Sequence, residues 1–206
     1  MQPTECLLAK CPHCKHKKKI MQLMSGNTFG ATLWSDSKQV APMLPTPSPI
    51  QKCPNCGHFY ELRKVKLKQG SDLWGETGWL QFDDAIDAYN ELPRETPQER
   101  EQLTIIFAWA FNDIYRFDHT PTPEQFDTFK RVISECLQLP IFTAPDQTLI
   151  KAELYREIGM FDKCISILND YNPGNEFELD IKNKIIEKAE ANDTKVFKLI
   201  DGRNRF

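Results

Sequence analysis

The second half of the chain places apolar residues with the period of an α-helix. Residues 98–117 show this most clearly, because large apolar side chains recur there every three or four positions. The members of this stripe are Leu103, Ile106, Phe107, Ala110, Phe111 and Ile114. The apolar pattern as a whole predicts helices near 79–91, 98–117, 123–138, 147–158, 161–171 and 176–191. Their connections are short, which favours antiparallel packing of neighbouring helices.

Three segments of this half carry residues that are typical of helix starts. In each, a Thr or Asn side chain can accept a hydrogen bond from a backbone N–H, while a later Glu or Gln reaches back. Two of the segments also have Pro at the first helical position, where its missing N–H costs nothing. The segments are Thr96-Pro97-Gln98-Glu99, Thr122-Pro123-Glu124-Gln125 and Asn175-Glu176-Phe177-Glu178.

Residues 1–68 lack this periodicity, and the composition changes near Gln69. We therefore expect two domains, 1–68 and 69–206, in a fold of the α+β class that is mostly α. Residues 32–34 could form a short strand, and the four prolines of residues 42–49 impose an extended course. This proline-rich segment is either a loop packed across the N-terminal domain or a docking segment. In the second case, the side chains that it would present are Trp34, Met43 and Leu44.

The net charge of −3 is distributed unevenly. Residues 1–68 carry 11 Lys and Arg against 3 Asp and Glu, a net charge of +8. Residues 69–206 carry 15 against 26, a net charge of −11. The chain shows neither a secretory signal nor an apolar stretch long enough to span a bilayer, so we expect a cytoplasmic protein without a membrane partner.

Four of the seven cysteines form two C-P-x-C pairs, which in a reducing compartment indicate metal binding. Two thiolates at this spacing converge on one metal from a tight turn, and two such turns complete a tetrahedral site. We predict one structural zinc ion, with iron or no metal as alternatives. Its ligands would be Cys11, Cys14, Cys53 and Cys56. Four thiolates leave no open coordination position, so we predict no catalytic role for the site.

The other cysteines and histidines have simpler expected roles. Cys6 would be a spare thiol near the terminus, whereas Cys136 and Cys164 lie on apolar helix faces and would be small core residues. Three histidines near the pairs could replace a cysteine ligand, but we expect them on the surface or beside the ligands. They are His13, His16 and His58.

Both pairs, with Gly57 after the second, resemble the knuckles of zinc ribbons and rubredoxin-like folds, over about residues 9–62. Residues 152–168 resemble a tetratricopeptide repeat (TPR). The family's aromatic, glycine, aromatic and large apolar positions match Tyr155, Gly159, Phe161 and Leu168, with Cys164 in place of the usual Ala. A weaker copy begins at Phe82, so the resemblance implies a TPR-like domain, and an irregular helical bundle is the alternative.

The whole chain resembles a class of uncharacterised bacterial proteins in which a ribbon with a Ser-Gly-Asn-Thr-Phe-Gly stretch precedes TPR-like helices. This resemblance implies an architecture but no activity, and we find no catalytic motif that would indicate an enzyme. Helical repeats typically bind proteins, so we expect a protein partner at the helical domain. The alternative is nucleic-acid binding by the basic ribbon through Lys15 to Lys19 and nearby aromatic residues.

Overall fold

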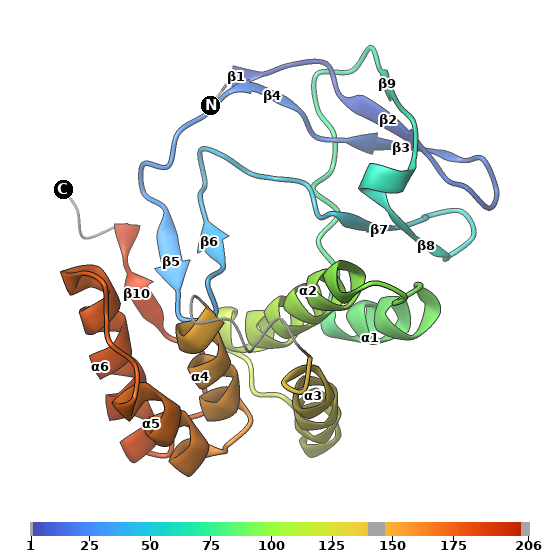
Figure 1. Ribbon diagram of the computed structural model, residues 1–206. Coiled ribbons are helices and arrows are strands. Elements are labelled where there is room, and N and C mark those ends of the chain that lie inside the picture. Colours follow the sequence, from blue (N-terminus) through green and yellow to red (C-terminus); the bar gives the residue numbers. More distant parts are fainter. Residues whose placement is uncertain (1, 140–146, 203–206) are drawn as a thin grey trace. The chain divides into compact units, whose positions relative to one another are not determined.

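The computed structural model describes residues 2–139 and 147–202 (Figure 1). Helices hold 43% of the described residues and strands 16%, so the fold is α+β and mostly α, as predicted. The chain forms two compact units. Unit 1 comprises residues 1–32, 40–93 and 201–206, and unit 2 comprises residues 33–39 and 94–200.

The two units differ in extent from the domains expected at 1–68 and 69–206. The helix at residues 82–91 belongs to unit 1 together with the paired cysteines, whereas residues 33–39 belong to unit 2. Independent folding of residues 69–206 stays a prediction, and the contacts of residues 33–39 offer a way to test it.

All six predicted helices are present in the described part of the chain. They are α1 (Phe82–Glu91), α2 (Pro97–Arg116), α3 (Pro123–Cys136), α4 (Thr148–Glu157), α5 (Phe161–Asn169) and α6 (Glu176–Glu190). At the start of α2, the Thr96 hydroxyl accepts from the Glu99 N–H at 3.2 Å, and the Glu99 carboxylate accepts from the Thr96 N–H at 3.1 Å. Thr122 and Gln125 repeat this exchange at the start of α3. Both helix starts therefore depend on neighbouring residues alone.

Short antiparallel strands form most of unit 1. They are β1 (Gln2–Pro3), β2 (Leu7–Lys10), β3 (Lys17–Ile20), β4 (Leu23–Ser25), β7 (Ile50–Lys52), β8 (Phe59–Glu61) and β9 (Leu67–Gln69). β2 pairs with both β3 and β9, β7 pairs with β8, and β1 pairs with β4. A 3-10 turn at Leu62–Lys64 follows β8. The core cluster that joins the β2–β3 and β7–β8 hairpins consists of Ala9, Cys11, Ile20, Cys53 and Tyr60.

The proline-rich segment is packed within unit 1. The Trp79 indole donates to the Thr46 carbonyl at 2.9 Å, and the Ser48 N–H donates to the Thr77 carbonyl at 2.6 Å. Trp34 instead belongs to unit 2. The three side chains of the suggested docking segment are thus divided between units, which favours the packed loop.

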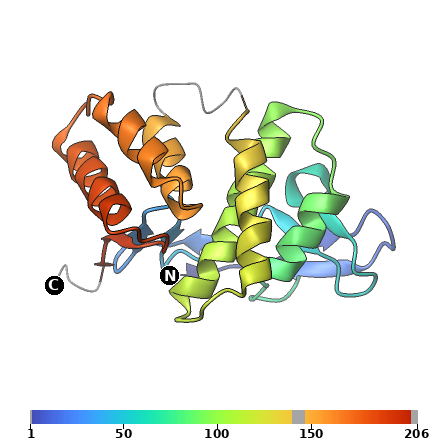
Figure 2. The ribbon, with the colours of Figure 1, turned by 90° about the horizontal axis from the view of Figure 1, so that it is seen from below.

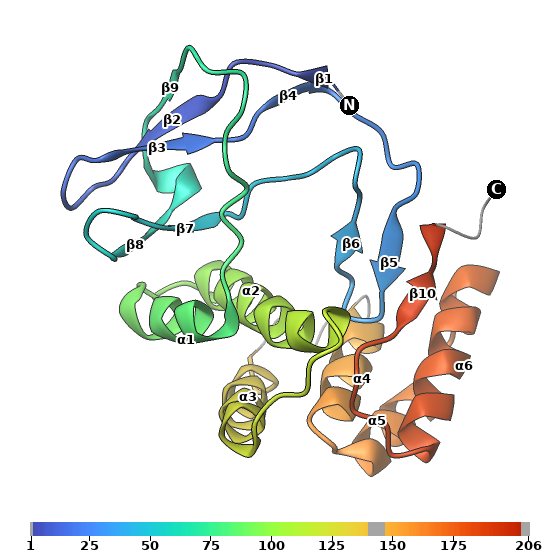
Figure 3. The ribbon, with the colours of Figure 1, turned by 180° about the vertical axis from the view of Figure 1, so that it is seen from behind.

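Three short strands bring together distant parts of the chain, and their residues 33, 34, 39 and 198–200 belong to unit 2. β10 (Lys198–Ile200) pairs antiparallel with β5 (Thr32–Trp34), which also neighbours β6 (Gln39–Val40), as Figure 3 shows. The Ser35 N–H donates to the Phe197 carbonyl at 2.8 Å, and the Ser35 hydroxyl accepts from the Phe197 N–H at 3.1 Å. The apolar pattern predicts β5 but not β10.

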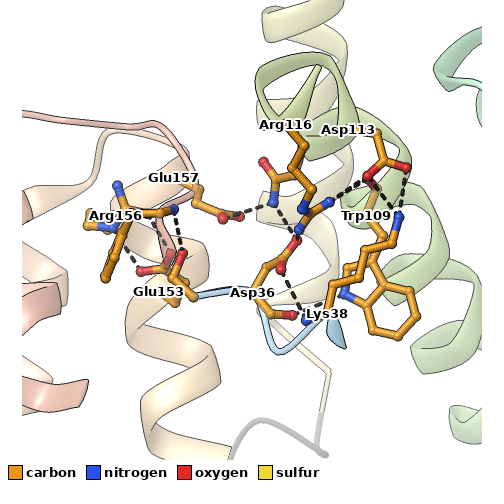
Figure 4. Close-up of polar contacts among 11 residues, drawn as sticks. Asp36, Lys38, Trp109, Asp113, Arg116, Glu153, Arg156 and Glu157 are labelled. Atoms are coloured by element: carbon orange, nitrogen blue, oxygen red, sulfur yellow. Dashed lines mark hydrogen bonds and ion pairs between the residues drawn. The ribbon is translucent and has the colours of Figure 1, made fainter. Parts of the chain in front are cut away.

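A buried polar network holds the β5–β6 connection in unit 2 (Figure 4). Asp36 forms an ion pair with Arg116, and these side chains are only 3% and 4% exposed. Asn112 donates to the same Asp36 carboxylate at 3.0 Å, while Arg116 also pairs with Asp113 at 2.8 Å. Lys38 then binds the Asp113 carboxylate at 2.7 Å. Each charge in this connection therefore has a partner of opposite sign, as burial requires.

The helices α4, α5 and α6 pack against one another within unit 2 (Figure 2). Gly159 lies in the turn between α4 and α5 with a φ of +79°, a conformation that glycine adopts without strain. Cys164 and Leu168 are fully buried, whereas Tyr155 and Phe161 are only partly buried. The weaker copy of the pattern lies in α1 and belongs to unit 1, so the two copies do not share a compact unit.

Candidate metal centre

Each cysteine pair lies at the tip of a β-hairpin, and the two tips have the same hydrogen bonds. In the β2–β3 hairpin, the Cys11 N–H donates to the His16 carbonyl at 2.8 Å. In the β7–β8 hairpin, the Cys53 N–H donates to the His58 carbonyl at 2.9 Å. The N–H of the fifth residue of each tip, Lys15 or Gly57, donates to the carbonyl of the first cysteine. The two C-P-x-C motifs thus form equivalent turns.

Lys15 adopts the backbone conformation that favours glycine. Its φ is +66°, close to the +78° of Gly57 at the equivalent position of the other tip. A left-handed conformation costs a residue with a side chain about 1–2 kcal/mol. Lys15 adopts this conformation despite its cost because the turn requires it. The Lys15 ammonium group also donates to the Pro12 carbonyl at 2.6 Å. The absence of glycine from the first motif therefore does not change the turn.

The hairpin tips bring the four cysteine sulfurs together, all within 4.8 Å of one another. The Sγ atoms of Cys11 and Cys56 are 3.8 Å apart, and those of Cys14 and Cys53 are 3.5 Å apart. Zinc–sulfur bonds of about 2.3 Å at tetrahedral angles place sulfurs about 3.8 Å apart. The spacing of the sulfurs therefore suits a tetrahedral metal ion with four thiolate ligands.

The environment of the thiols differs around the cluster. A hydrogen bond from the His16 backbone N–H lowers the pKa of Cys14 to about 6. The His58 backbone N–H has the same effect on Cys56, but partial desolvation and hydrogen bonds with the three neighbouring thiols outweigh it and raise the pKa of Cys56 to about 12. Without a cation, the chain therefore disfavours ionising all four thiols together. A bound metal ion would supply the charge that four thiolates need.

Cysteines of the cluster also belong to the apolar core of unit 1. Cys11 and Cys53 are 1% and 2% exposed and pack with Tyr60, whereas Cys14 is partly buried and Cys56 is exposed. Burial, followed by the negative charge of the cysteines, raises the pKa of Tyr60 to about 12. The first cysteine of each pair therefore contributes to packing, and its loss would affect the core as well as the metal site.

The remaining cysteines lie away from this cluster. Cys136 and Cys164 are buried on helices of unit 2, which confirms their expected place in the core. Cys6 is a free thiol, as expected, but it is fully buried, so the expectation that it lies in a flexible terminus is wrong. Its N–H donates to the Asp72 carbonyl, and its own carbonyl accepts from the Gly70 N–H at 2.8 Å. These bonds enclose Cys6 in unit 1.

Two histidines of the hairpin tips meet a carboxylate that the sequence analysis did not associate with them. The rings of His13 and His58 are stacked with centroids 4.2 Å apart, and His58 Nδ1 lies 3.0 Å from Glu91 Oε1. His16 is not part of this group. Glu91 ends α1, and its separation from the histidines in sequence leaves no local signal that would reveal the contact.

Two of the basic residues of β3 have acidic partners within their own unit. Lys19 lies 3.0 Å from Asp72, and Lys18 lies 3.7 Å from Glu76. The hydrogen bond with Asp72, aided by its charge, raises the pKa of Lys19. Unit 1 carries 12 Lys and Arg against 9 Asp and Glu, so most of the +8 of residues 1–68 is balanced there.

No protein-family model, curated protein or solved structure matches this chain. None of the helices in the described ranges combines the length and apolar character that crossing a bilayer requires. The function must therefore be argued from the geometry of the chain itself.

Proposed function

We propose that this chain is a non-enzymatic zinc-binding protein, with a structural four-cysteine site in a zinc ribbon and a TPR-like helical domain that binds another protein. The observation that carries the proposal is the convergence of four sulfurs from two equivalent hairpin tips. Thiolates are ligands that zinc prefers, and a closed set of four is typical of structural sites. The ligands would be Cys11, Cys14, Cys53 and Cys56.

The physical role of the zinc ion would be to join the two hairpins of unit 1. β2–β3 and β7–β8 belong to different small sheets, and the core cluster that joins them contains two of the cysteines. Such a small core buries little apolar surface, so metal–thiolate bonds would supply much of its stability. Iron would suit the same ligands, and a colourless protein with zinc would exclude it.

Elemental analysis of freshly purified full-length protein tests the metal proposal, and we expect about one zinc per chain. Cys14→Ser should abolish zinc binding, because one of four ligands is lost. Cys164→Ala is the matched control, because it removes a buried thiol of unit 2 and should retain the zinc. Wild-type protein without metal, or zinc content unchanged in Cys14→Ser, would refute the proposal.

The protein-binding part of the proposal is supported by apolar side chains that α5 and α6 leave exposed. Phe177 and Leu179 of α6 are each 46% exposed, and Met160, just before α5, is 38% exposed. Exposed aromatic and aliphatic groups on packed helices are typical of surfaces that bind protein segments. Phe177 and Leu179 are two positions apart and therefore lie on opposite sides of α6, so each is a separate candidate contact for a partner with apolar side chains.

An affinity purification from native extract, with and without nuclease, tests these two contacts. A specific partner should bind the wild type with nuclease present and be lost from Phe177→Ser/Leu179→Ser. Phe117→Ser is a matched control, because Phe117 is 63% exposed but lies at the end of α2. Equal capture by all three proteins would refute a role for Phe177 and Leu179.

Nucleic-acid binding by the ribbon is the alternative, and its support is weaker. Lys18 and Lys19 have acidic partners, and the aromatic side chains of Phe59 and Tyr60 are only 4% and 3% exposed. A fluorescence titration with random single-stranded DNA and RNA distinguishes the two functions. Tight binding that is lost on replacing Lys17, Lys18 and Lys19 with Glu would establish the alternative.

A further inference from the structure

A second group of metal-binding side chains lies in unit 1 beside the four cysteines. His13 and His58 come from the two hairpin tips, and Glu91 comes from the last position of α1. One ligand atom from each of these residues lies within 4.8 Å of the other two, and all three residues are exposed. We propose that His13, His58 and Glu91 bind a second, exchangeable divalent metal ion, such as zinc, copper or nickel.

The backbone around this group restricts where the three side chains can go. Both histidines are in tips whose turns are closed by backbone hydrogen bonds. Glu91 Oε1 accepts from the Phe59 N–H at 3.0 Å and lies 3.0 Å from His58 Nδ1, which fixes the end of α1 against β8. Lys52 of β7 adds an ion pair with Asp84 of α1 at 2.6 Å. The backbone thus places the three side chains close together before any metal binds.

The carboxylate of Glu91 still has an oxygen available. Both contacts described above fall on Oε1, and Oε2 has no hydrogen-bond partner among the residues that the structure describes. Glu91 also lines an open hollow of about 460 Å³, so a metal ion can reach it from solvent. The other residues of this hollow are Lys52, Gly57, Phe59, Asp87 and Asn90.

The ligand set determines the kind of ion. Imidazole nitrogens suit zinc, copper and nickel, whereas calcium and magnesium prefer oxygen ligands alone. Metal bonds of about 2.0–2.2 Å require tetrahedral ligands about 3.4 Å apart, so side-chain rotations of His13 and Glu91 can close the site. Three protein ligands leave one coordination position open, unlike the closed four-cysteine site. The second ion would therefore exchange and could take a ligand from solution.

A simple ion pair accounts for only part of this arrangement. His58 and Glu91 form such a pair, and the His13 ring, stacked on His58, lies beside both without taking part in it. A metal ion uses all three residues. This inference goes beyond the structural zinc site, because it concerns different ligands and a different, reversible binding event.

Calorimetric titration of full-length protein, already loaded with one zinc per chain, tests the proposal with zinc as the titrant. We expect one further zinc per chain. His58→Ala and Glu91→Gln should each weaken this event by about tenfold or more, since they remove a ligand. His16→Ala is the matched control, because His16 is an exposed histidine of the first tip outside the group, and it should bind as the wild type does.

Paramagnetic nickel gives a local measurement on the same protein. It should broaden the NMR signals of the His13 and His58 rings in the wild type, and broaden them less in Glu91→Gln. The absence of a second event, or equal affinity in Glu91→Gln, His16→Ala and wild type, would overturn the proposal. Elemental analysis counts the first zinc separately, so failure of one site is distinguishable from failure of the other. If His58→Ala also loses the first zinc, the result for Glu91→Gln alone decides the proposal.

Discussion

Asp36→Ala should destabilise the helices of unit 2, although Asp36 lies far from them in the sequence. The substitution removes the Asp36 carboxylate and leaves Arg116, whose side chain is 4% exposed, with only one acidic partner. Removing one member of a buried ion pair typically costs about 3–5 kcal/mol, because the remaining charge stays buried. Asp113 still pairs with Arg116 at 2.8 Å, so we expect the lower end of this range, about 3 kcal/mol.

Thermal unfolding followed by circular dichroism at a helix wavelength measures this effect, because unit 2 contains α2 to α6. At roughly 4 °C per kcal/mol for a unit of this size, the Tm should fall by roughly 12 °C. Urea denaturation provides an independent value of the free energy of unfolding.

Two further variants show whether the buried ion pair is the cause. Glu135→Ala removes an acidic residue of α3 whose side chain is 57% exposed in its pair with Arg131, and should change the stability by less than about 1 kcal/mol. Asp36→Ala/Arg116→Met should lose less stability than the two single variants added together, because no unpaired charge remains. A Tm for Asp36→Ala equal to that of Glu135→Ala would refute the reasoning and favour a helical domain of residues 69–206 that folds without Asp36.

Two other predictions concern the core of unit 2. Burial, with added repulsion from Glu153 and Asp36, raises the pKa of Glu157 well above its usual 4.5, so the folded state holds this proton more tightly than the unfolded state. The unfolding free energy should therefore fall as the pH rises above about 4.5, and Glu157→Gln should gain stability over the wild type in urea titrations at increasing pH. Leu168→Ala should cost about 2–5 kcal/mol of unfolding free energy, because Leu168 is fully buried, and Phe161→Ala should cost less because Phe161 is only partly buried.

Each of these predictions has a clear contrary outcome. A constant difference in unfolding free energy between Glu157→Gln and wild type at every pH would show that Glu157 titrates normally. A larger loss in Phe161→Ala than in Leu168→Ala would contradict the burial of these side chains, and Cys164→Ala serves as the small-volume control at the same core.

The sequence predicts several elements of this protein because they depend on interactions between adjacent residues. The capping residues Thr96 and Thr122 bond to groups three positions away, so the starts of α2 and α3 depend on only a few adjacent residues. The C-P-x-C motifs likewise close their own turns, and their convergence could be predicted because a tetrahedral metal site would need four ligands.

The remaining features depend on residues that are distant in the chain, and only the tertiary structure decides them. β10 has no strong pattern of its own and is a strand because β5 offers it hydrogen-bond partners. From the sequence, Asp36 is an ordinary turn residue, and only the structure shows its ion pair with Arg116, 80 positions later. From the sequence, Glu91 is an ordinary surface residue of a helix, and only the structure shows that His58 and His13 lie beside it. Contacts of this kind depend on how elements pack, and a single sequence carries no local signal for them.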